Sequence, residues 1–316
     1  MTAEKLPPLL ALAGPTASGK TALSVALASR FSAEVICADS MQIYAGLSIG
    51  TARPTDEETK GVPHHLFGFV PPERAYSVAQ YAADARRVID EVHRRGNLPF
   101  LCGGTGLYLE AVLDNLQYAD EPEDSAVRDR LKAEAAQVGN EAMLERLRAI
   151  DPDTAARLHP NDQGRILRAL EVFEVTGVTM TEQKRRSRAV PSPYRSHLLV
   201  LDYRNRQTLY DRIDRRVDLM LSAGLAEEAK AFLSAGHAPT AMQAIGYKEL
   251  LPWLNGEKSL EEAAEDLKQS TRRYAKRQLS WFRRMEKATF YYVDDYPTAA
   301  ALTDAVAQSI TAFLEE

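Results

Sequence analysis

The fold of this chain is decided by residues 9–21, which read Leu9-Leu-Ala-Leu-Ala-Gly-Pro-Thr-Ala-Ser-Gly-Lys-Thr21. The apolar start predicts a buried strand, and the remainder fits the pattern G-x-x-x-x-G-K-[ST] in full. Apolar residues recur from Leu23 to Leu27, which predicts a helix directly after the loop. A glycine-rich loop between a strand and a helix binds phosphate oxygens with its backbone N–H groups. These residues therefore predict a site for a di- or triphosphate.

Each residue of this loop is a candidate ligand contact, and the flanking strand and helix disfavour a chance match. Lys20 adds a mobile positive charge near the outer phosphate, and the Thr21 hydroxyl is the expected ligand for Mg²⁺. The predicted binding loop consists of Gly14, Pro15, Thr16, Ala17, Ser18, Gly19, Lys20 and Thr21.

Composition limits the class of protein. With 316 residues, 45% of them hydrophobic and 26% charged, the chain has an ordinary globular composition and is long enough for two domains. No apolar run approaches the roughly 18 residues of a membrane span, so we expect no membrane partner. Cys37 and Cys102 each end an apolar run, which predicts buried free thiols in a reducing cytoplasm and no zinc site.

Charge is unevenly distributed along the chain. A net charge of −5 argues against a uniformly basic nucleic-acid binder. Basic residues nevertheless cluster in residues 184–188 and again in residues 272–287, whereas acidic residues concentrate elsewhere. This segregation suits a polyanion that binds on one side.

Two further strands are predicted at residues 33–38 and 98–102, and each ends in a polar residue or a tight turn. Asp39 follows the first, where open α/β sheets place their ligands, although a turn or helix cap is an alternative reading. Thr105 follows the second, within a turn of small residues, Gly103 to Gly106, that we expect to admit a compact group beside the phosphates. Adjacent His64 and His65 lack metal-ligand spacing and are interpreted as structural or loop contacts.

Residues 114–193 contain no strand signal but carry short amphipathic helices, at 127–137, 142–150 and 164–175. Strands are again predicted at 197–202 and 289–293. The predicted fold is an α/β core formed by residues 1–113 and 194–316, into which residues 114–193 insert as an α-helical domain.

Two predicted helices of the second half carry cations. In the helix at 207–223, Arg212 and Arg216 are four residues apart and project from one side, as if an anion lay between them. Ser259 and Glu262 form a capping box that opens a long helix. Four basic residues share one side of that helix without acidic partners before Glu286, namely Arg272, Lys276, Arg283 and Lys287.

Taken together, these segments resemble bacterial tRNA dimethylallyltransferases over nearly the whole chain. The P-loop alone is common to many families, but the ordered set is specific. The matching segments are Gly14-Pro-Thr-Ala-Ser-Gly-Lys-Thr21, Asp39-Ser-Met-Gln-Ile-Tyr44, Gly50-Thr-Ala-Arg-Pro54, Pro63-His-His-Leu66, Gly103-Gly-Thr-Gly-Leu-Tyr108, Gln243-Ala-Ile-Gly-Tyr-Lys-Glu249 and Lys276-Arg-Gln-Leu-Ser-Trp-Phe-Arg283. The resemblance implies transfer of a dimethylallyl group from dimethylallyl diphosphate to the exocyclic amine of the adenosine immediately 3′ of the anticodon.

The resemblance also implies roles for individual residues. Asp39 is the family's general base, Thr105 and Arg212 assist catalysis, and Arg216 joins the P-loop and Mg²⁺ in binding the diphosphate. The resemblance further implies that the α/β core has a parallel, P-loop NTPase-like sheet and that the insertion domain lies on the anticodon stem-loop of the tRNA. We expect the protein to act as a monomer. The positions expected to hold the tRNA are Asp39, Ser40, Met41, Gln42, Thr105, Gln163, Gly164, Arg165, Ile166, Leu167, Arg272 and Lys276.

Two other functions fit the P-loop. A small-molecule or nucleotide kinase uses the same loop but also needs a second strand that ends in a magnesium-binding acid. The strand that ends at Cys102 has no such acid, which disfavours this alternative. A non-catalytic P-loop module that binds RNA is the third possibility.

Overall fold

The structure is a computed structural model that describes residues 5–117, 125–235 and 240–316. By internal contacts the chain divides into two compact units. Unit 1 combines Met1–Leu113 with Pro193–Glu316, and unit 2 is Asp114–Ser192. None of the helices in the described ranges combines the length and apolar character needed to cross a membrane.

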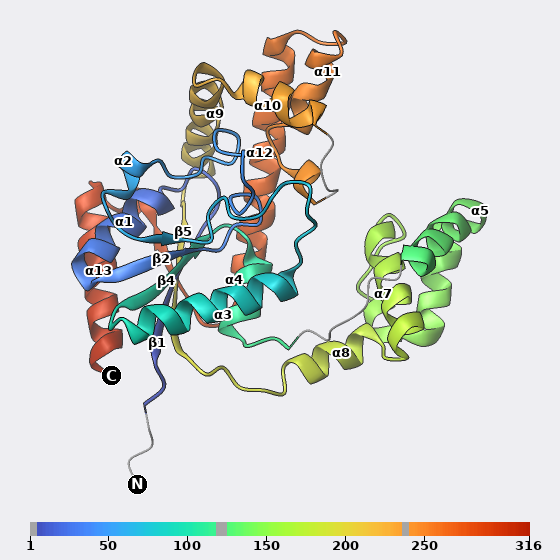
Figure 1. The fold of residues 1–316 in the computed structure, drawn as a ribbon, viewed down its shortest axis with the longest axis horizontal. Coiled ribbons are helices and arrows are strands. Elements are labelled where there is room, and N and C mark those ends of the chain that lie inside the picture. Colours follow the sequence, from blue (N-terminus) through green and yellow to red (C-terminus); the bar gives the residue numbers. More distant parts are fainter. Residues whose placement is uncertain (1–4, 118–124, 236–239) are drawn as a thin grey trace. The chain divides into compact units, whose positions relative to one another are not determined.

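Unit 1 is built on a six-stranded sheet in the order β3-β2-β4-β1-β5-β6 (Figure 1). Every neighbouring pair is parallel. The central strands are buried apolar runs, as parallel sheets covered on both faces require. The strands are β1 Pro8–Ala13, β2 Ala33–Cys37, β3 His64–His65, β4 Leu98–Gly103, β5 Arg195–Asp202 and β6 Ala288–Tyr292.

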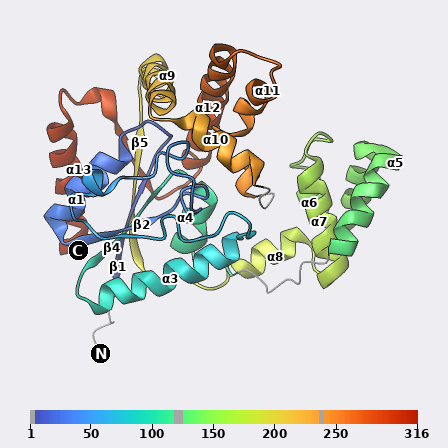
Figure 2. The ribbon, with the colours of Figure 1, turned by 45° about the horizontal axis from the view of Figure 1, so that its top comes forward.

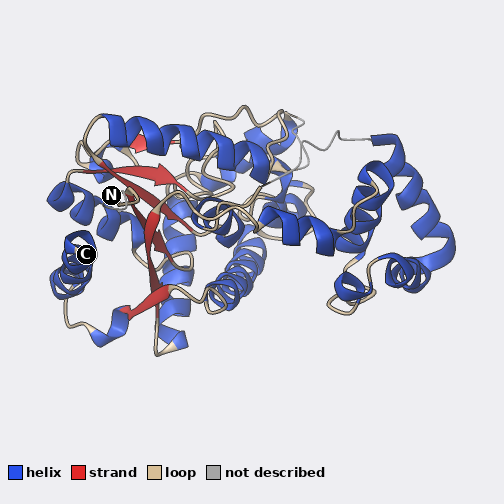
Figure 3. Ribbon diagram, turned by 90° about the horizontal axis from the view of Figure 1, so that it is seen from below, coloured by secondary structure: helices blue, strands red, loops and turns tan. Residues whose placement is uncertain are grey.

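Helices cover both faces of this sheet, with a separate apolar core on each (Figure 3). On one face lie α1 (Lys20–Phe31) and α13 (Ala299–Glu315). The other face carries α3 (Val78–Arg94), α4 (Gly106–Leu113), α9 (Arg206–Ser222), α10 (Leu225–Ser234) and α12 (Leu260–Phe282). The view in Figure 2 shows α9 and α12 close together, and the two helices are in contact.

Helix starts follow local chemistry. Ser77 and Ser259 cap α3 and α12 with complete capping boxes, in which the side chains of Gln80 and Glu262 bond back to the cap N–H. The box at Ser259 confirms the prediction. Short elements complete the unit: α2 Asp56–Thr59, α11 Leu251–Leu254, and the 3₁₀ helices Ala241–Gln243, Lys248–Leu250 and Val293–Asp295.

Two expectations about unit 1 have clear outcomes. Cys37 and Cys102 are free and buried, as predicted, and they are register partners on β2 and β4. Within the described residues the sheet has six strands, whereas five were predicted, because His64 and His65 pair with β2 as the short edge strand β3. A pair of residues is too short to show an alternating pattern, so periodicity could not reveal this strand.

Unit 2 contains helices and no strand among its described residues. They are α5 Ser125–Ile150, α6 Pro152–Ala155, α7 Gln163–Thr176 and α8 Met180–Ser187. Gly139 interrupts α5 with non-helical angles, φ 83° and ψ 162°, so α5 consists of two helices, as predicted. The apolar core of unit 2 contains Leu131, Leu144, Leu147, Ile166 and Leu170.

Candidate active site

A pocket of about 1300 Å³ lies in unit 1 at the carboxyl ends of β1, β2 and β4. Four segments far apart in the sequence form much of its wall: Thr16–Ala22, Asp39–Gln42, Ser48–Thr55, and Arg212 with Arg215 to Val217. Parallel sheets bring the loops after their strands to one edge, which explains why these segments meet.

The P-loop begins at Gly14 with φ 155° and ends at Gly19 with φ 93°, the residue before α1. A side chain at Gly19 would be strained because that angle lies in the left-handed region. The first N–H groups of α1 have no partner within the helix and so remain available to an anion. Ser18 is only 2% exposed, yet its Oγ has no hydrogen-bond partner among the described residues. The loop therefore carries donors suited to phosphate oxygens.

Lys20 is held against the loop that it follows. Its Nζ donates to the carbonyl oxygens of Gly14, at 2.9 Å, and Pro15, at 2.8 Å. An ammonium has three donors, so one remains for a ligand. Burial lowers the pKa of Lys20 to about 8, against the opposing effect of the Asp39 carboxylate. A bound anion would stabilise the charged form and raise this pKa.

Arg212 and Arg216 of α9 both line the pocket, as their four-residue spacing suggested. Arg212 Nε donates to the carbonyl oxygen of Ala17 in the P-loop at 3.0 Å. Burial lowers the pKa of Arg216, while the charges of Asp39 and Glu58 act to raise it. The two guanidinium groups thus flank the same loop that carries Lys20.

Asp39 follows β2 and lines this pocket. Its Oδ1 accepts hydrogen bonds from the backbone N–H groups of Met41, at 2.9 Å, and Gln42, at 3.4 Å. These bonds leave acceptor capacity on the second oxygen. Asp39 therefore does form the bonds of a turn or cap residue, as the alternative interpretation expected, and its carboxylate also interacts electrostatically with Lys20 and Arg216.

Thr105 holds the segment that contains Asp39. Its Oγ1 accepts from the N–H of Ser40 at 2.9 Å and donates to Ser40 Oγ at 3.2 Å. Tyr274 of α12 also shares a hydrogen bond with Thr105, lines the pocket, and has a pKa raised by burial. Tyr274 stands among the apolar residues of this helix, so its residue type and spacing gave no sign of this contact in the sequence.

Gln278 is a second residue that sequence reasoning missed. It is 5% exposed, and its Oε1 accepts from the N–H of Thr16 at 2.9 Å while its Nε2 donates to Gly104 O at 2.9 Å. A glutamine inside an otherwise apolar helix face was the available signal, because a buried amide requires partners.

Gly103, at the end of β4, lines the pocket, so the expectation that the turn of residues 103–106 admits a compact ligand group stays a prediction. The glycines of the turn also have a structural reason. A Cβ built on Gly103 would lie 2.1 Å from Ala38 O, and one on Gly104 would lie 2.2 Å from Gln278 Nε2. A Cβ on Gly106 would lie 2.3 Å from the ring of Trp281. These glycines are small because protein atoms already fill the space beside them.

Two of the four basic residues predicted to lack acidic partners on and after α12 do form ion pairs. Arg272 pairs with Asp214 of α9, and Arg283 pairs with the buried Asp202 at 2.7 Å. The acidic partners come from α9 and β5, and residue spacing along a single helix cannot reveal such pairs. Lys276 is exposed and forms no ion pair with any residue in the described ranges.

In unit 2, the residues expected to hold RNA lie at the start of α7. Gln163, Gly164 and Arg165 are exposed, whereas Ile166 is fully buried and Leu167 nearly so. The side chains of Ile166 and Leu167 belong to the core of the unit, so they are not available to RNA. Only their backbone could take part.

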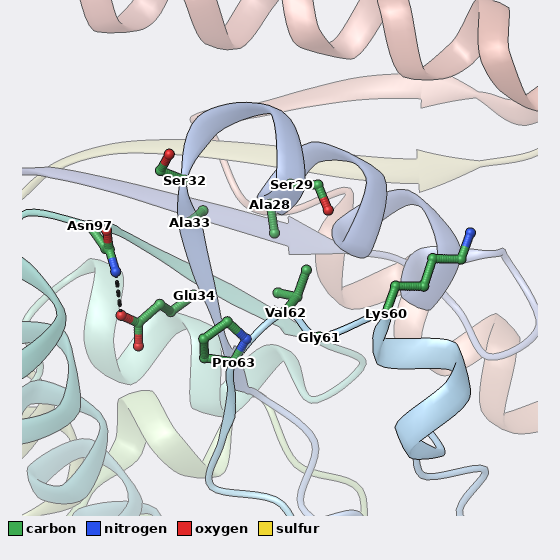
Figure 4. A pocket seen from close by; sticks show the side chains of 10 residues that line it. All are labelled: Ala28, Ser29, Ser32, Ala33, Glu34, Lys60, Gly61, Val62, Pro63 and Asn97. Atoms are coloured by element: carbon green, nitrogen blue, oxygen red, sulfur yellow. Dashed lines mark hydrogen bonds between the residues drawn. The ribbon is translucent and has the colours of Figure 1, made fainter.

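A smaller pocket of about 310 Å³ lies near the start of β2 (Figure 4). Its one buried acid, Glu34, accepts hydrogen bonds from Arg95 and Asn97, and His65 Nε2 lies 2.6 Å from it. The Arg95 hydrogen bonds lead the causes that lower the pKa of Glu34 to about 2. This ionised cluster joins β2, β3 and the end of α3, which supports the structural interpretation of His65.

The larger pocket offers oxygen atoms as candidate metal ligands. Within the described ranges, no three His, Cys, Asp or Glu side chains are grouped to hold a metal ion. Thr21 and Asp39 both line the pocket, however, and supply oxygen atoms. Mg²⁺ is commonly bound by one or two such oxygens together with substrate phosphates, so these residues fit that ion.

Comparison with known proteins gives the same family throughout. The family model described as IPP transferase matches residues 42–285, and the model described as isopentenyl transferase matches residues 7–67. The tRNA dimethylallyltransferase of Halalkalibacterium halodurans is 47% identical over 288 residues, 91% of each chain. That of Caldanaerobacter subterraneus subsp. tengcongensis is 43% identical over 301 residues, which cover 94% of this chain and 96% of the relative.

Solved structures agree. The tRNA isopentenylpyrophosphate transferase of Bacillus halodurans superposes with a TM-score of 0.73 at 43% identity, covering 98% of this chain and 97% of that one. A eukaryotic dimethylallyltransferase described as acting on tRNA gives a TM-score of 0.81 at 29% identity, covering 97% and 80%. These neighbours have a P-loop NTPase-like fold, which confirms the predicted fold class. With matches that span nearly its full length, the chain belongs to the tRNA dimethylallyltransferase family, a family of prenyl-transferring enzymes.

Proposed function

We propose that this protein transfers a dimethylallyl group from dimethylallyl diphosphate to the exocyclic amine of the adenosine immediately 3′ of the anticodon in tRNA. The observation that carries the proposal is that the P-loop and Asp39 line one pocket. The reaction requires a site that binds the diphosphate leaving group, which the P-loop supplies, and a group that accepts the amine proton, which Asp39 supplies.

The cations of the pocket act on the leaving group. As the bond between the allylic carbon and oxygen breaks, negative charge grows on the diphosphate, and Lys20, Arg212 and Arg216 stabilise it. Thr21 would ligate Mg²⁺, and the bound ion would neutralise phosphate charge.

Asp39 acts on the acceptor. The lone pair of the adenine amine forms the new carbon–nitrogen bond while the carbon–oxygen electron pair leaves with the diphosphate. The amine must also lose a proton, and the Asp39 carboxylate accepts it. Hydrogen bonds from Met41 and Gln42 to Oδ1 fix the orientation of that carboxylate, and Thr105 fixes Ser40 beside it.

Unit 2 serves as the domain that contacts the anticodon stem-loop. Its exposed Gln163, Gly164 and Arg165 are available to phosphate or base edges at the start of α7, and Lys276 of α12 is available in unit 1. The adenine must leave the stacked loop to reach Asp39, which costs a few kcal/mol. We expect the protein to work in the cytoplasm, where its tRNA substrate is found, and as a monomer.

A kinase is the alternative, because the P-loop would also bind ATP. The acid that kinases place at the end of a second strand is missing from β4, which ends in Gly103. Calorimetric titration with magnesium present compares the two ligands directly. We expect tight binding of dimethylallyl diphosphate, whereas tight binding and turnover of ATP without a response to the prenyl donor would favour the kinase.

The transfer itself is tested with labelled dimethylallyl diphosphate and two tRNA anticodon stem-loops. One has adenosine 3′ of the anticodon, and the other has guanosine there. We expect label only on the first RNA. Binding of both RNAs without transfer would instead favour a non-catalytic RNA-binding module.

A further inference from the structure

Glu228 of α10 accepts more hydrogen bonds than an ordinary surface carboxylate. Its Oε2 accepts from the N–H of Ser48 at 3.1 Å, from Ser48 Oγ at 2.8 Å and from the N–H of Ile49 at 2.9 Å. Its Oε1 accepts from the N–H of Gly50 at 2.9 Å and from the phenol of Tyr247 at 2.7 Å. Five donors thus converge on one carboxylate. Four of them belong to the loop of residues 48–50, which lies about 180 positions earlier in the chain.

These bonds determine the ionisation of both side chains. Burial raises the pKa of Glu228, but the hydrogen bonds from Gly50, Ile49, Tyr247 and Ser48 outweigh it and keep the pKa below its ordinary value. The carboxylate is therefore charged at neutral pH. Burial and this carboxylate together raise the pKa of Tyr247, which stays a donor.

Tyr247 adds a steric contact to the same loop. A Cβ on Gly50 would lie 2.7 Å from the Tyr247 ring, so the fully buried ring packs directly on the glycine backbone. Two segments far apart in the sequence, residues 47–54 and residues 243–249, therefore meet at Glu228.

The held loop forms a wall of the pocket, from Ser48 to Thr55. It is also joined to the segment that carries the base, because Gln42 Nε2 donates to the carbonyl oxygens of Thr51, at 2.9 Å, and Ala52, at 3.0 Å. The N–H of Gln42 in turn contacts Asp39 Oδ1. A continuous set of contacts runs from Glu228 through the loop and Gln42 to Asp39.

We propose that Glu228 is a positioning residue for prenyl transfer, which holds the loop of residues 48–52 and, through Gln42, the segment that carries Asp39. This inference rests on the proposed function. Glu228 acts on the acceptor side of the pocket, and the P-loop lies outside this set of contacts. Its loss should therefore impair transfer more than diphosphate binding.

The test compares Glu228→Gln with Glu227→Gln, an exposed neighbour on the same helix. The glutamine side chain of Glu228→Gln keeps the shape of the glutamate. Its NH₂ group, however, would face the backbone N–H groups of the loop, so that donor meets donor. The number of active sites and the Kd for dimethylallyl diphosphate come from calorimetry, and kcat per site comes from the transfer assay. For Glu228→Gln we expect Kd within twofold of wild type and kcat per site lower by roughly 10–100-fold, since an error of about 1 Å in position has such effects. For Glu227→Gln both stay unchanged.

A purely structural role would reduce the number of sites and leave kcat per site within twofold, which would overturn the inference. Should Glu228→Gln not fold, Tyr247→Phe keeps the ring on Gly50 and removes one donor. We expect a fall of about threefold in its kcat per site, and an unchanged value would contradict the inference. Absence of transfer by the wild-type chain would instead overturn the proposed function, and this inference with it.

Discussion

The side-chain oxygen of Gln278 accepts a hydrogen bond from the backbone N–H of Thr16 at 2.9 Å, across 262 positions of the chain. The nitrogen of the same amide donates to Gly104 O. Helix α12 is thereby fixed both to the P-loop and to the turn after β4. One amide thus sets the distance between the phosphate-binding loop and the segment around Thr105.

We predict that Gln278→Ala lowers the free energy of unfolding by about 2–4 kcal/mol, because it leaves a buried N–H and a buried C=O without partners. It should also weaken binding of dimethylallyl diphosphate by releasing Thr16. Urea denaturation and calorimetry measure the two effects. Gln269→Ala, at an exposed position of the same helix, should change stability by less than about 0.5 kcal/mol. Equal stability of the two variants would contradict the assigned role.

Diphosphate affinity should decrease as the pH rises through about 8. The reason is that Lys20 must be charged to attract the ligand, and burial lowers its pKa to about 8 in the free protein. Phosphate groups have a second pKa near 6, so the ligand stays fully ionised over this range. Calorimetric titrations of dimethylallyl diphosphate from pH 7 to 9.5 measure the effect. Lys20→Ala should bind weakly at every pH, and a decrease of the same size in that variant would assign the titration to another group.

Lys276 and Arg272 should behave differently, although both lie on α12. Lys276 is free to meet a phosphate, so Lys276→Ala should weaken every tRNA alike and reduce the slope of log K against log salt by about 1. Arg272 is held by Asp214, so Arg272→Ala should mainly lower stability, by about 1 kcal/mol, with a smaller change in slope. Filter-binding titrations across salt concentrations measure both. Loss of affinity for only some anticodon sequences would show that Lys276 reads bases.

The sequence predicted the features that depend on neighbouring residues. The P-loop, the five longer strands, the arginine pair of α9 and the capping box of Ser259 are all local patterns, and each is present in the structure. The short strand β3 was missed because only its pairing with β2 makes it a strand.

Features that depend on distant contacts were missed or misread. Glu228 gave no sequence signal, because its five donors come from residues 48–50 and from Tyr247. The glycines of residues 103–106 suggested space for a ligand, whereas Ala38, Gln278 and Trp281 lie where side chains at these positions would be. A glycine shows that something lies close by and does not show whether it is substrate or protein.

The central claim is that Asp39 takes the proton from the adenine amine, and single-turnover transfer by Asp39→Asn tests it most directly. The asparagine keeps an oxygen for the N–H groups of Met41 and Gln42 but cannot accept the proton. With saturating tRNA and labelled dimethylallyl diphosphate, we predict a transfer rate lower by about 10²–10⁴-fold while calorimetry shows both substrates still bound. A rate within a few fold of wild type would contradict the account.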